Sequence, residues 1–291
     1  MINKKTKGDV KMTTFPAFFR FPGFTWRACT MTYDDGPAED IRFIEIMRQY
    51  GLRGTFNLTK DYLLTGWTGV RDALTVQQVK DIFRDDTEIA LHGCEHYSLA
   101  RTPNPITLRE LIECKAFLEE QFGQPVRGIA TPYGSCDEDV QKLFKMIGLD
   151  YARDSVRSSE SFEMPTDWLR WEATSRSRHP RLFENVDLFL GNDYFRKIGT
   201  RRPLLFNLWG HTYEFTEDNN WGDFERFCDK MANAGNVWFG TNIEVYRYVD
   251  AFNRLIFSAD GSFVENPSAI DVYLCYRDVD VIIPAGKTVW F

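Results

Sequence analysis

One repeated unit constrains the fold of this chain more than any other feature. Between about residues 25 and 250, a short apolar run is followed by a polar or glycine-containing break and then by an amphipathic stretch. Seven runs are typical of β-strands: FTWRACTMTY, RGTFNL, TEIALHG, RGIATPY, LDYARD, PLLFNLWG and NVWFGT. Helix-like segments such as AEDIRFIEIMRQYGL and TLRELIECKAFLEEQFG lie between them. The alternation predicts an α/β fold, a distorted (β/α) barrel of about seven parallel strands.

The last part of the chain has a different pattern. Residues 255–291 contain an Asp-Gly turn between two alternating runs and show no helical period. We therefore expect a small antiparallel β appendage that packs on the barrel or extends it. The predicted division is a barrel domain at residues 1–250 and a β-rich C-terminal extension at residues 251–291.

Composition and charge exclude several classes of protein. A net charge of -7 without a long basic block argues against nucleic-acid and membrane-surface binding. The basic start MINKKTKGDVKMTTF leads into no apolar segment of signal-peptide length, and no stretch approaches the roughly 18 apolar residues of a membrane span. We therefore expect a soluble cytoplasmic protein whose six scattered cysteines are reduced. The sequence does not indicate an oligomeric state.

Four polar clusters directly follow predicted strands. In chain order they are Asp34 with Asp35, His92 with His96, the ATPYG segment at residues 130–134, and His211. Each alone has an ordinary structural interpretation, since Asp-Asp-Gly-Pro is typical of turns and a single histidine is more often a core residue. The carboxyl ends of parallel strands meet on one face of a barrel, so we expect the four clusters to lie together.

Taken together, the clusters predict a metal-dependent hydrolytic site. One carboxylate and two histidines are a common ligand set for a catalytic divalent ion, and either Asp34 or Asp35 with His92 and His96 supplies it. The other carboxylate would lie beside the attacking water as a general base. His211 could then donate a proton to the leaving group.

These motifs resemble those of the polysaccharide deacetylases, also called carbohydrate esterase family four. The first family motif, T-[FY]-D-D-G, is matched by Thr32–Gly36, and the second, H-[ST]-x-x-H, by His92–His96 with Gly93 in the Ser/Thr position. The third, R-x-P-[YF]-G, is matched only at residues 132–134. The fifth, an apolar strand that ends in His, is matched by LLFNLWGH. The resemblance covers roughly residues 25–250.

The resemblance implies a distorted (β/α) barrel and a metal-dependent hydrolase that removes acetyl groups, usually from N-acetylated sugars. By position, the metal ligands would be Asp35, His92 and His96. Asp34 would be the general base, the Tyr133 backbone N–H would help to stabilise the oxyanion, and His211 would protonate the departing amine. Carboxylate and imidazole ligands suit zinc first, and also cobalt, iron or nickel.

The third motif departs from the family at its arginine, which usually pairs with the catalytic aspartate. The chain has Ala130 at that position. Without a cationic partner the base would have a raised pKa, unless another cation takes the place of the arginine. Arg153 is the leading candidate for that replacement, ahead of Arg176 and Arg178.

The fourth family motif, an Asp-rich segment before a Trp that orients the catalytic histidine, has no clear match. Asp154 and the TDW segment at Thr166–Trp168 are the two candidates, and the sequence does not choose between them. Trp209 and His179 complete the candidates for tuning the site or contacting substrate. His179 lies in a polar, arginine-rich segment, which is more typical of a surface residue.

Three functions remain open from the sequence. The leading one is a hydrolase that acts on an N- or O-acetylated saccharide, and the lack of an export signal favours a soluble saccharide over a cell-wall polymer. The altered third motif also fits an amidase that acts on a small non-sugar compound. The third is a pseudoenzyme that binds carbohydrate without turnover.

Overall fold

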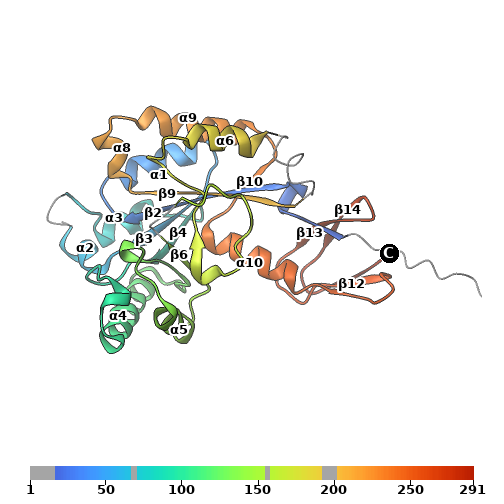
Figure 1. Ribbon diagram of the computed structural model, residues 1–291, viewed down its shortest axis with the longest axis horizontal. Coiled ribbons are helices and arrows are strands. Elements are labelled where there is room, and N and C mark those ends of the chain that lie inside the picture. Colours follow the sequence, from blue (N-terminus) through green and yellow to red (C-terminus); the bar gives the residue numbers. More distant parts are fainter. Residues whose placement is uncertain (1–16, 67–70, 155–157, 192–201) are drawn as a thin grey trace, which may run out of the picture.

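A parallel sheet forms the centre of the computed structural model, which describes residues 17–66, 71–154, 158–191 and 202–291 (Figure 1). Eight strands follow the order β7-β6-β5-β4-β3-β2-β9-β8, and β10 pairs with β2 beside this path. The strands are β2 (Arg27–Asp35), β3 (Gly54–Leu58), β4 (Thr87–Leu91), β5 (Gly128–Ala130), β6 (Tyr151–Asp154), β7 (Trp171–Glu172), β8 (Ser175–Arg176), β9 (Leu204–Gly210) and β10 (Val237–Phe239).

The two ends of this sheet are joined by one short segment of chain. β7 pairs with β6 at one edge and β8 pairs with β9 at the other, although only two residues separate β7 from β8. Between them, the Thr174 N–H donates to the Asn207 carbonyl at 3.0 Å. The sheet therefore curls into a distorted barrel, which confirms the predicted fold. β7 and β8 were not predicted, because each has only two residues and so no period to detect.

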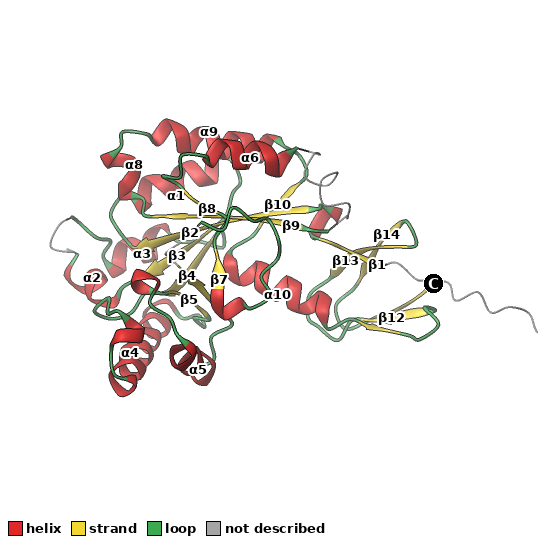
Figure 2. Ribbon diagram, viewed as in Figure 1, coloured by secondary structure: helices red, strands yellow, loops and turns green. Residues whose placement is uncertain are grey.

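Helices cover the outside of the sheet and bury the largest apolar cluster against it. They are α1 (Asp40–Gln49), α2 (Lys60–Thr65), α3 (Val76–Ile82), α4 (Asn104–Phe122), α5 (Glu138–Met146), α6 (Leu182–Leu190), α8 (Tyr213–Glu217), α9 (Trp221–Asn233) and α10 (Asn242–Asn253). Figure 2 shows α1, α6 and α9 on one side and α4 and α5 on the other. Phe43 of α1 stacks on Phe224 of α9 with the ring centroids 4.0 Å apart. Within the described residues, no helix is both long and apolar enough to cross a membrane.

The C-terminal residues form an antiparallel appendage, as predicted. Its two sheets have the orders β1-β13-β14 and β11-β12-β15. Their strands are β1 (Ala17–Arg20), β11 (Ile256–Phe257), β12 (Phe263–Glu265), β13 (Val272–Tyr276), β14 (Val279–Ile283) and β15 (Thr288–Trp290). The sequence did not indicate that β1, from the other end of the chain, pairs with β13. Figure 1 shows the appendage beyond α10, away from α2 and α4. The domain division at residue 250 stays a prediction.

Candidate active site

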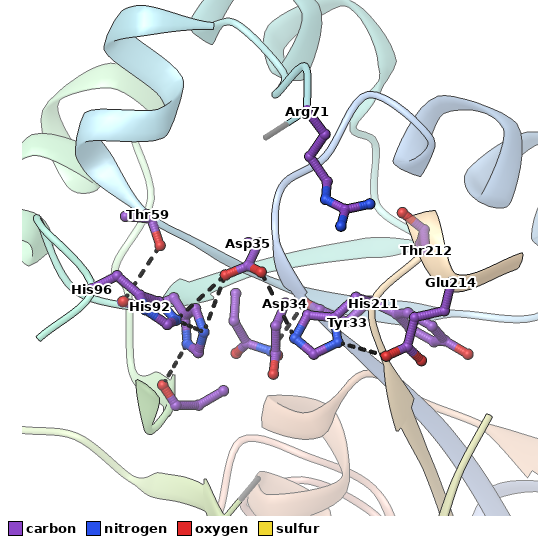
Figure 3. A network of polar contacts seen from close by, with 12 residues as sticks. Tyr33, Asp34, Asp35, Thr59, Arg71, His92, His96, His211, Thr212 and Glu214 are labelled. Carbon is purple, nitrogen blue, oxygen red and sulfur yellow. Dashed lines mark hydrogen bonds and ion pairs between the residues drawn. The ribbon is translucent and has the colours of Figure 1, made fainter. Parts of the chain in front are cut away.

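The polar clusters at the carboxyl ends of β2, β4, β5 and β9 come together at one end of the barrel. Figure 3 shows Asp34, Asp35, His92, His96 and His211 close to one another. These side chains line a cavity of about 370 Å³ together with Tyr133, Arg176, Trp209 and Tyr213. The parallel strands cause this arrangement, because their carboxyl ends all open on the same face.

Three of these residues form a ligand set for a metal ion. Nε2 of His92 and Nε2 of His96 each lie 3.5 Å from Oδ1 of Asp35. One ligand atom from each of the three residues lies within 4.8 Å of the other two. Among the described residues this is the one such group of His, Cys, Asp and Glu. Asp35 Oδ1 is buried and has no hydrogen-bond partner in the described part of the chain, as expected for an atom that coordinates an ion.

The two histidines are in the protonation state that metal binding needs. Nδ1 of His92 lies 2.8 Å from the Ala130 carbonyl, which can only accept, so Nδ1 carries the proton and Nε2 presents its lone pair. Burial lowers the pKa of His92, and burial together with His92 lowers the pKa of His96 to about 4. Both imidazoles are therefore neutral at pH 7. The donor set fits a divalent ion such as zinc.

Residues with left-handed backbone conformations occur both at Asp35 and in the loop that carries His92 and His96. Asp35 has φ 77° and Gly36 has φ 71°, and a Cβ at Gly36 would come within 2.9 Å of Leu58. Gly93 has φ 88°, and a Cβ there would meet Oε1 of Glu110 at 2.8 Å. That oxygen accepts the Glu95 N–H at 2.7 Å and so supports the histidine loop from α4. Gly93 therefore stands where the family has Ser or Thr because a side chain there would clash with Glu110 and because the backbone is left-handed.

Asp34 is buried beside the ligand set and paired with Arg153. Nη2 of Arg153 donates to both carboxylate oxygens of Asp34 at 2.5 Å, and Nδ2 of Asn57 donates to Oδ1 at 2.8 Å. Arg153 of β6 lies directly opposite Ala130 of β5 in the parallel register. The guanidinium missing from residue 130 is thus supplied by the neighbouring strand. Burial alone would raise the pKa of Asp34, but Arg153, His92 and His211 together hold it below its ordinary value.

His211 is oriented by Glu214, a residue that was not among the predicted site residues. Its Nδ1 lies 3.1 Å from Oε1 of the buried Glu214, and its Nε2 lies 3.7 Å from Oδ2 of Asp35. Arg176 donates to Glu214, and Nη1 of Arg178 lies 3.7 Å from it. Burial would lower the pKa of His211, but the bond to Glu214 and the charges of Asp34 and Asp35 raise it. The H-x-x-E spacing was the available signal, because a turn in which the Glu214 N–H donates to the His211 carbonyl at 3.0 Å brings the two side chains together.

The other candidates for this orienting role lie elsewhere. Asp167, in the TDW segment, accepts the Leu169 N–H at 2.9 Å and so caps a short 3-10 helix (Trp168–Arg170). Asp154 is the last residue of β6 and does not line the cavity. Arg178, which was a candidate for the cation on Asp34, instead donates to Glu217 and Asp218. The orienting carboxylate is therefore Glu214.

Replacing Glu214 tests this arrangement directly. Glu214→Gln removes the negative charge next to His211 Nδ1, so the pKa of His211 is expected to fall and its proton to be lost at a lower pH. NMR titration of His211 in chelator-treated protein measures that change. If the chain is a hydrolase, kcat should fall about tenfold to a hundredfold, less than loss of the general acid itself would cost. An unchanged His211 pKa would contradict the role of Glu214, and Glu217→Gln, on the same helix, is the control.

The remaining predicted residues separate into two groups. Trp209 is buried at the cavity wall with the Arg153 and Arg176 guanidinium carbons each 5.0 Å from its ring centroid. Its Nε1 has no hydrogen-bond partner among the residues that the structure describes. His179 lies outside the site, since its Nε2 is 3.5 Å from Glu160 and it lines a different cavity. The structure thus brings Trp209 to the site and leaves His179 apart from it.

Comparisons with known proteins concern the family and the fold of the chain. Residues 24–152 match the family model described as Polysaccharide deacetylase, which confirms the resemblance seen in the motifs. No curated protein matches the sequence. The chain covers only part of some of the solved structures that it matches, and in one of them the match spans 54% of that protein's length.

Three solved structures show the same fold. A Mycobacterium smegmatis protein assigned to the polysaccharide deacetylases has 18% identity and a TM-score of 0.56, over 82% of this chain and 96% of that one. The chitin deacetylase of the fungal pathogen Colletotrichum lindemuthianum has 15% identity and a TM-score of 0.51, over 75% and 86%. Wild-type BA3943 of Bacillus anthracis, a carbohydrate esterase family four pseudoenzyme, has 16% identity and a TM-score of 0.51, over 76% and 65%.

Proposed function

We propose that this chain of the polysaccharide deacetylase family is a metal-dependent hydrolase that removes acetyl groups from an N- or O-acetylated saccharide. The observation that carries the proposal is the ligand set Asp35, His92 and His96, with an ionised Asp34 beside it and a protonatable His211 facing the same cavity. Arg153 and Asn57 hold Asp34 in place, the Ala130 carbonyl holds His92, and Glu214 holds His211. The family match supports the substrate class.

Asp35, His92 and His96 would hold the divalent ion. When bound, such an ion polarises a carbonyl and lowers the pKa of a water molecule toward about 7. Zinc is the expected metal, with cobalt, iron or nickel also suited to these ligands.

The other side chains have complementary protonation states. Asp34 is ionised at neutral pH because Arg153 keeps its pKa low, so it can accept the proton of the attacking water. His211, with its raised pKa, can hold a proton at Nε2 and transfer it to the departing amine or alcohol. As the water oxygen bonds to the acetyl carbon, the bond to the sugar nitrogen or oxygen breaks and acetate leaves. The Tyr133 N–H would stabilise the oxyanion, a contribution commonly on the order of 3 kcal/mol.

Acetate release from a panel of compounds tests the proposal. The panel contains N-acetylglucosamine oligomers, acetylated xylan fragments and small non-sugar amides, and each is assayed with zinc- or cobalt-loaded protein. Release from an acetylated saccharide, abolished by a chelator, is the expected result. Turnover of only the small amides would favour the amidase. A stoichiometric ion that is lost in His92→Ala, without turnover of any compound, would favour a binding pseudoenzyme. The cytoplasmic location expected from the sequence is part of the same proposal.

A further inference from the structure

A second cavity adjoins the proposed reaction site. It has a volume of about 470 Å³ and is lined by Ser98, Arg101, Tyr133, Gly134 and Ser135. Tyr133 also lines the cavity that holds the metal ligands, so one side chain borders both spaces. The lining residues come from the loops that follow β4 and β5, the loops that also carry His96 and Tyr133. The two cavities therefore open from the same end of the barrel.

Tyr133 stands between the two cavities instead of packing into the core. It follows Pro132 in a short 3-10 turn, and its left-handed backbone, with φ 57°, is unusual for a bulky residue. The side chain is 68% exposed, and its ring meets the His96 ring edge-on at a centroid distance of 4.6 Å. An exposed aromatic ring held at the rim of a site provides a flat apolar surface with a polar tip. A sugar ring can lie against such a surface.

Arg101 is the charged residue of the second cavity. It ends a 3-10 helix (Leu99–Arg101), and within the described ranges its guanidinium has neither an ion pair nor a hydrogen bond. The arginines on the other side of the site differ, because Arg176 binds Glu214 and Arg178 binds Asp218. A guanidinium that faces a cavity without an acidic partner is suited to a carboxylate, sulfate or phosphate.

The rest of the cavity wall is held by its own hydrogen bonds. Ser98 Oγ donates to Ser135 Oγ at 2.9 Å, and the Ala100 N–H donates to the same oxygen at 3.0 Å. Asp137, two residues after Ser135, accepts the Val140 N–H at 2.9 Å as the N-cap of α5. Glu95, the acid nearest to Arg101 along the chain, accepts the Tyr97 hydroxyl. The loop that presents Arg101 is thus tied to the loop that presents Tyr133. A ligand in this cavity would contact both without a rearrangement of the wall.

We propose that this second cavity is a subsite for the sugar unit next to the acetylated one, and that Arg101 selects substrates in which that unit carries an anionic group. Tyr133 supplies the apolar surface and Arg101 supplies the charge. The proposal rests on the proposed deacetylase function. It adds that the preferred saccharide is acidic and has at least two units.

The test compares two acetylated oligosaccharides of equal length, one neutral and one with a uronate next to the acetylated unit, on metal-loaded protein. The wild type is expected to have a kcat/KM about tenfold higher for the acidic oligosaccharide. Arg101→Gln should remove this preference by raising the KM for the acidic oligosaccharide about tenfold. The matched control is Arg109→Gln on α4, whose Nε lies 3.8 Å from Glu113, outside both cavities. A sulfated oligosaccharide in a third arm shows whether the anion must be a carboxylate. A preference that survives Arg101→Gln, or that Arg109→Gln removes equally, would overturn the proposal.

A binding measurement separates this proposal from the proposed function. If no saccharide releases acetate, the deacetylase function fails, and calorimetric titration with the acidic oligosaccharide then tests the subsite alone. Binding that weakens about tenfold in Arg101→Gln, and not in Arg109→Gln, supports the subsite. Equal affinity in the two variants, or no binding to the wild type, overturns it.

Discussion

An Asp34→Asn variant is expected to keep its bound divalent ion and to release acetate about 10²–10⁴ times more slowly than the wild type. The reason is that Asp34 lies beside the ligand set and is engaged by Arg153 and Asn57 instead of by the ligand cluster. Asparagine has nearly the same shape but cannot accept the proton of the attacking water. Elemental analysis measures whether the variant keeps the ion. The kcat on the best substrate of the panel measures the loss of rate.

The neighbouring carboxylate is the matched control for this prediction. Asp35→Ala removes one of the three ligands, so the ion itself should be lost, and activity with it. Excess zinc should partly restore the activity of Asp35→Ala and should not restore that of Asp34→Asn. If Asp34→Asn also lost the ion, or kept more than a tenth of the wild-type rate, the assignment of the two adjacent carboxylates to different roles would be wrong.

Of the variants proposed here, Arg153→Ala is expected to lose the most stability, about 3–5 kcal/mol in the free energy of unfolding near pH 7. Arg153 and Asp34 are both fully enclosed, and removal of the guanidinium leaves a buried carboxylate without its counter-charge. Urea unfolding of chelator-treated protein measures the loss. Catalysis should fall as well, because the base loses the group that keeps it ionised.

The loss of stability in Arg153→Ala should depend on pH in a defined direction. In the wild type the pKa of Asp34 is lowered, so the pair contributes stability above the unfolded-state pKa of about 3.9 and loses it as the pH falls through the folded pKa. Without Arg153, burial raises the pKa of Asp34, and the folded variant takes up a proton more readily. The difference between variant and wild type should therefore be largest near neutral pH and shrink toward pH 4.

Arg127→Ala provides the comparison for this stability effect. Arg127 makes a bidentate ion pair with Asp150, in which Nη2 lies 2.7 Å from Oδ1 and Nε lies 3.0 Å from Oδ2. Unlike Arg153, the Arg127 side chain is 40% exposed. Its loss should cost no more than about 1 kcal/mol, as is usual for pairs in contact with water. If the two variants lost equal free energy of unfolding, or if the loss in Arg153→Ala did not vary with pH, the buried Arg153–Asp34 pair would not have the stabilising role described here.

Most of the fold could be predicted because its signals are local. The strands and helices follow from short apolar runs and amphipathic stretches, and the Asp-Gly turn in residues 255–291 indicated the antiparallel appendage. β7 and β8 were missed since they have two residues each and are defined by their partners β6 and β9. The pairing of β1 with β13 was missed for the same reason, because it joins segments from opposite ends of the chain.

By itself, the sequence determined which residues follow the strands, and in a parallel barrel those positions meet at one end. That was enough to predict Asp34, Asp35, the two histidines of the second motif and His211 as site residues. Only the tertiary structure decided that Arg153, opposite Ala130, is the cation on Asp34, and that Glu214 and not Asp154 orients His211. Periodicity places a side chain on a face but does not give the register between strands or the direction in which a loop turns. Those depend on contacts between residues far apart in the chain, which form only when the whole barrel closes.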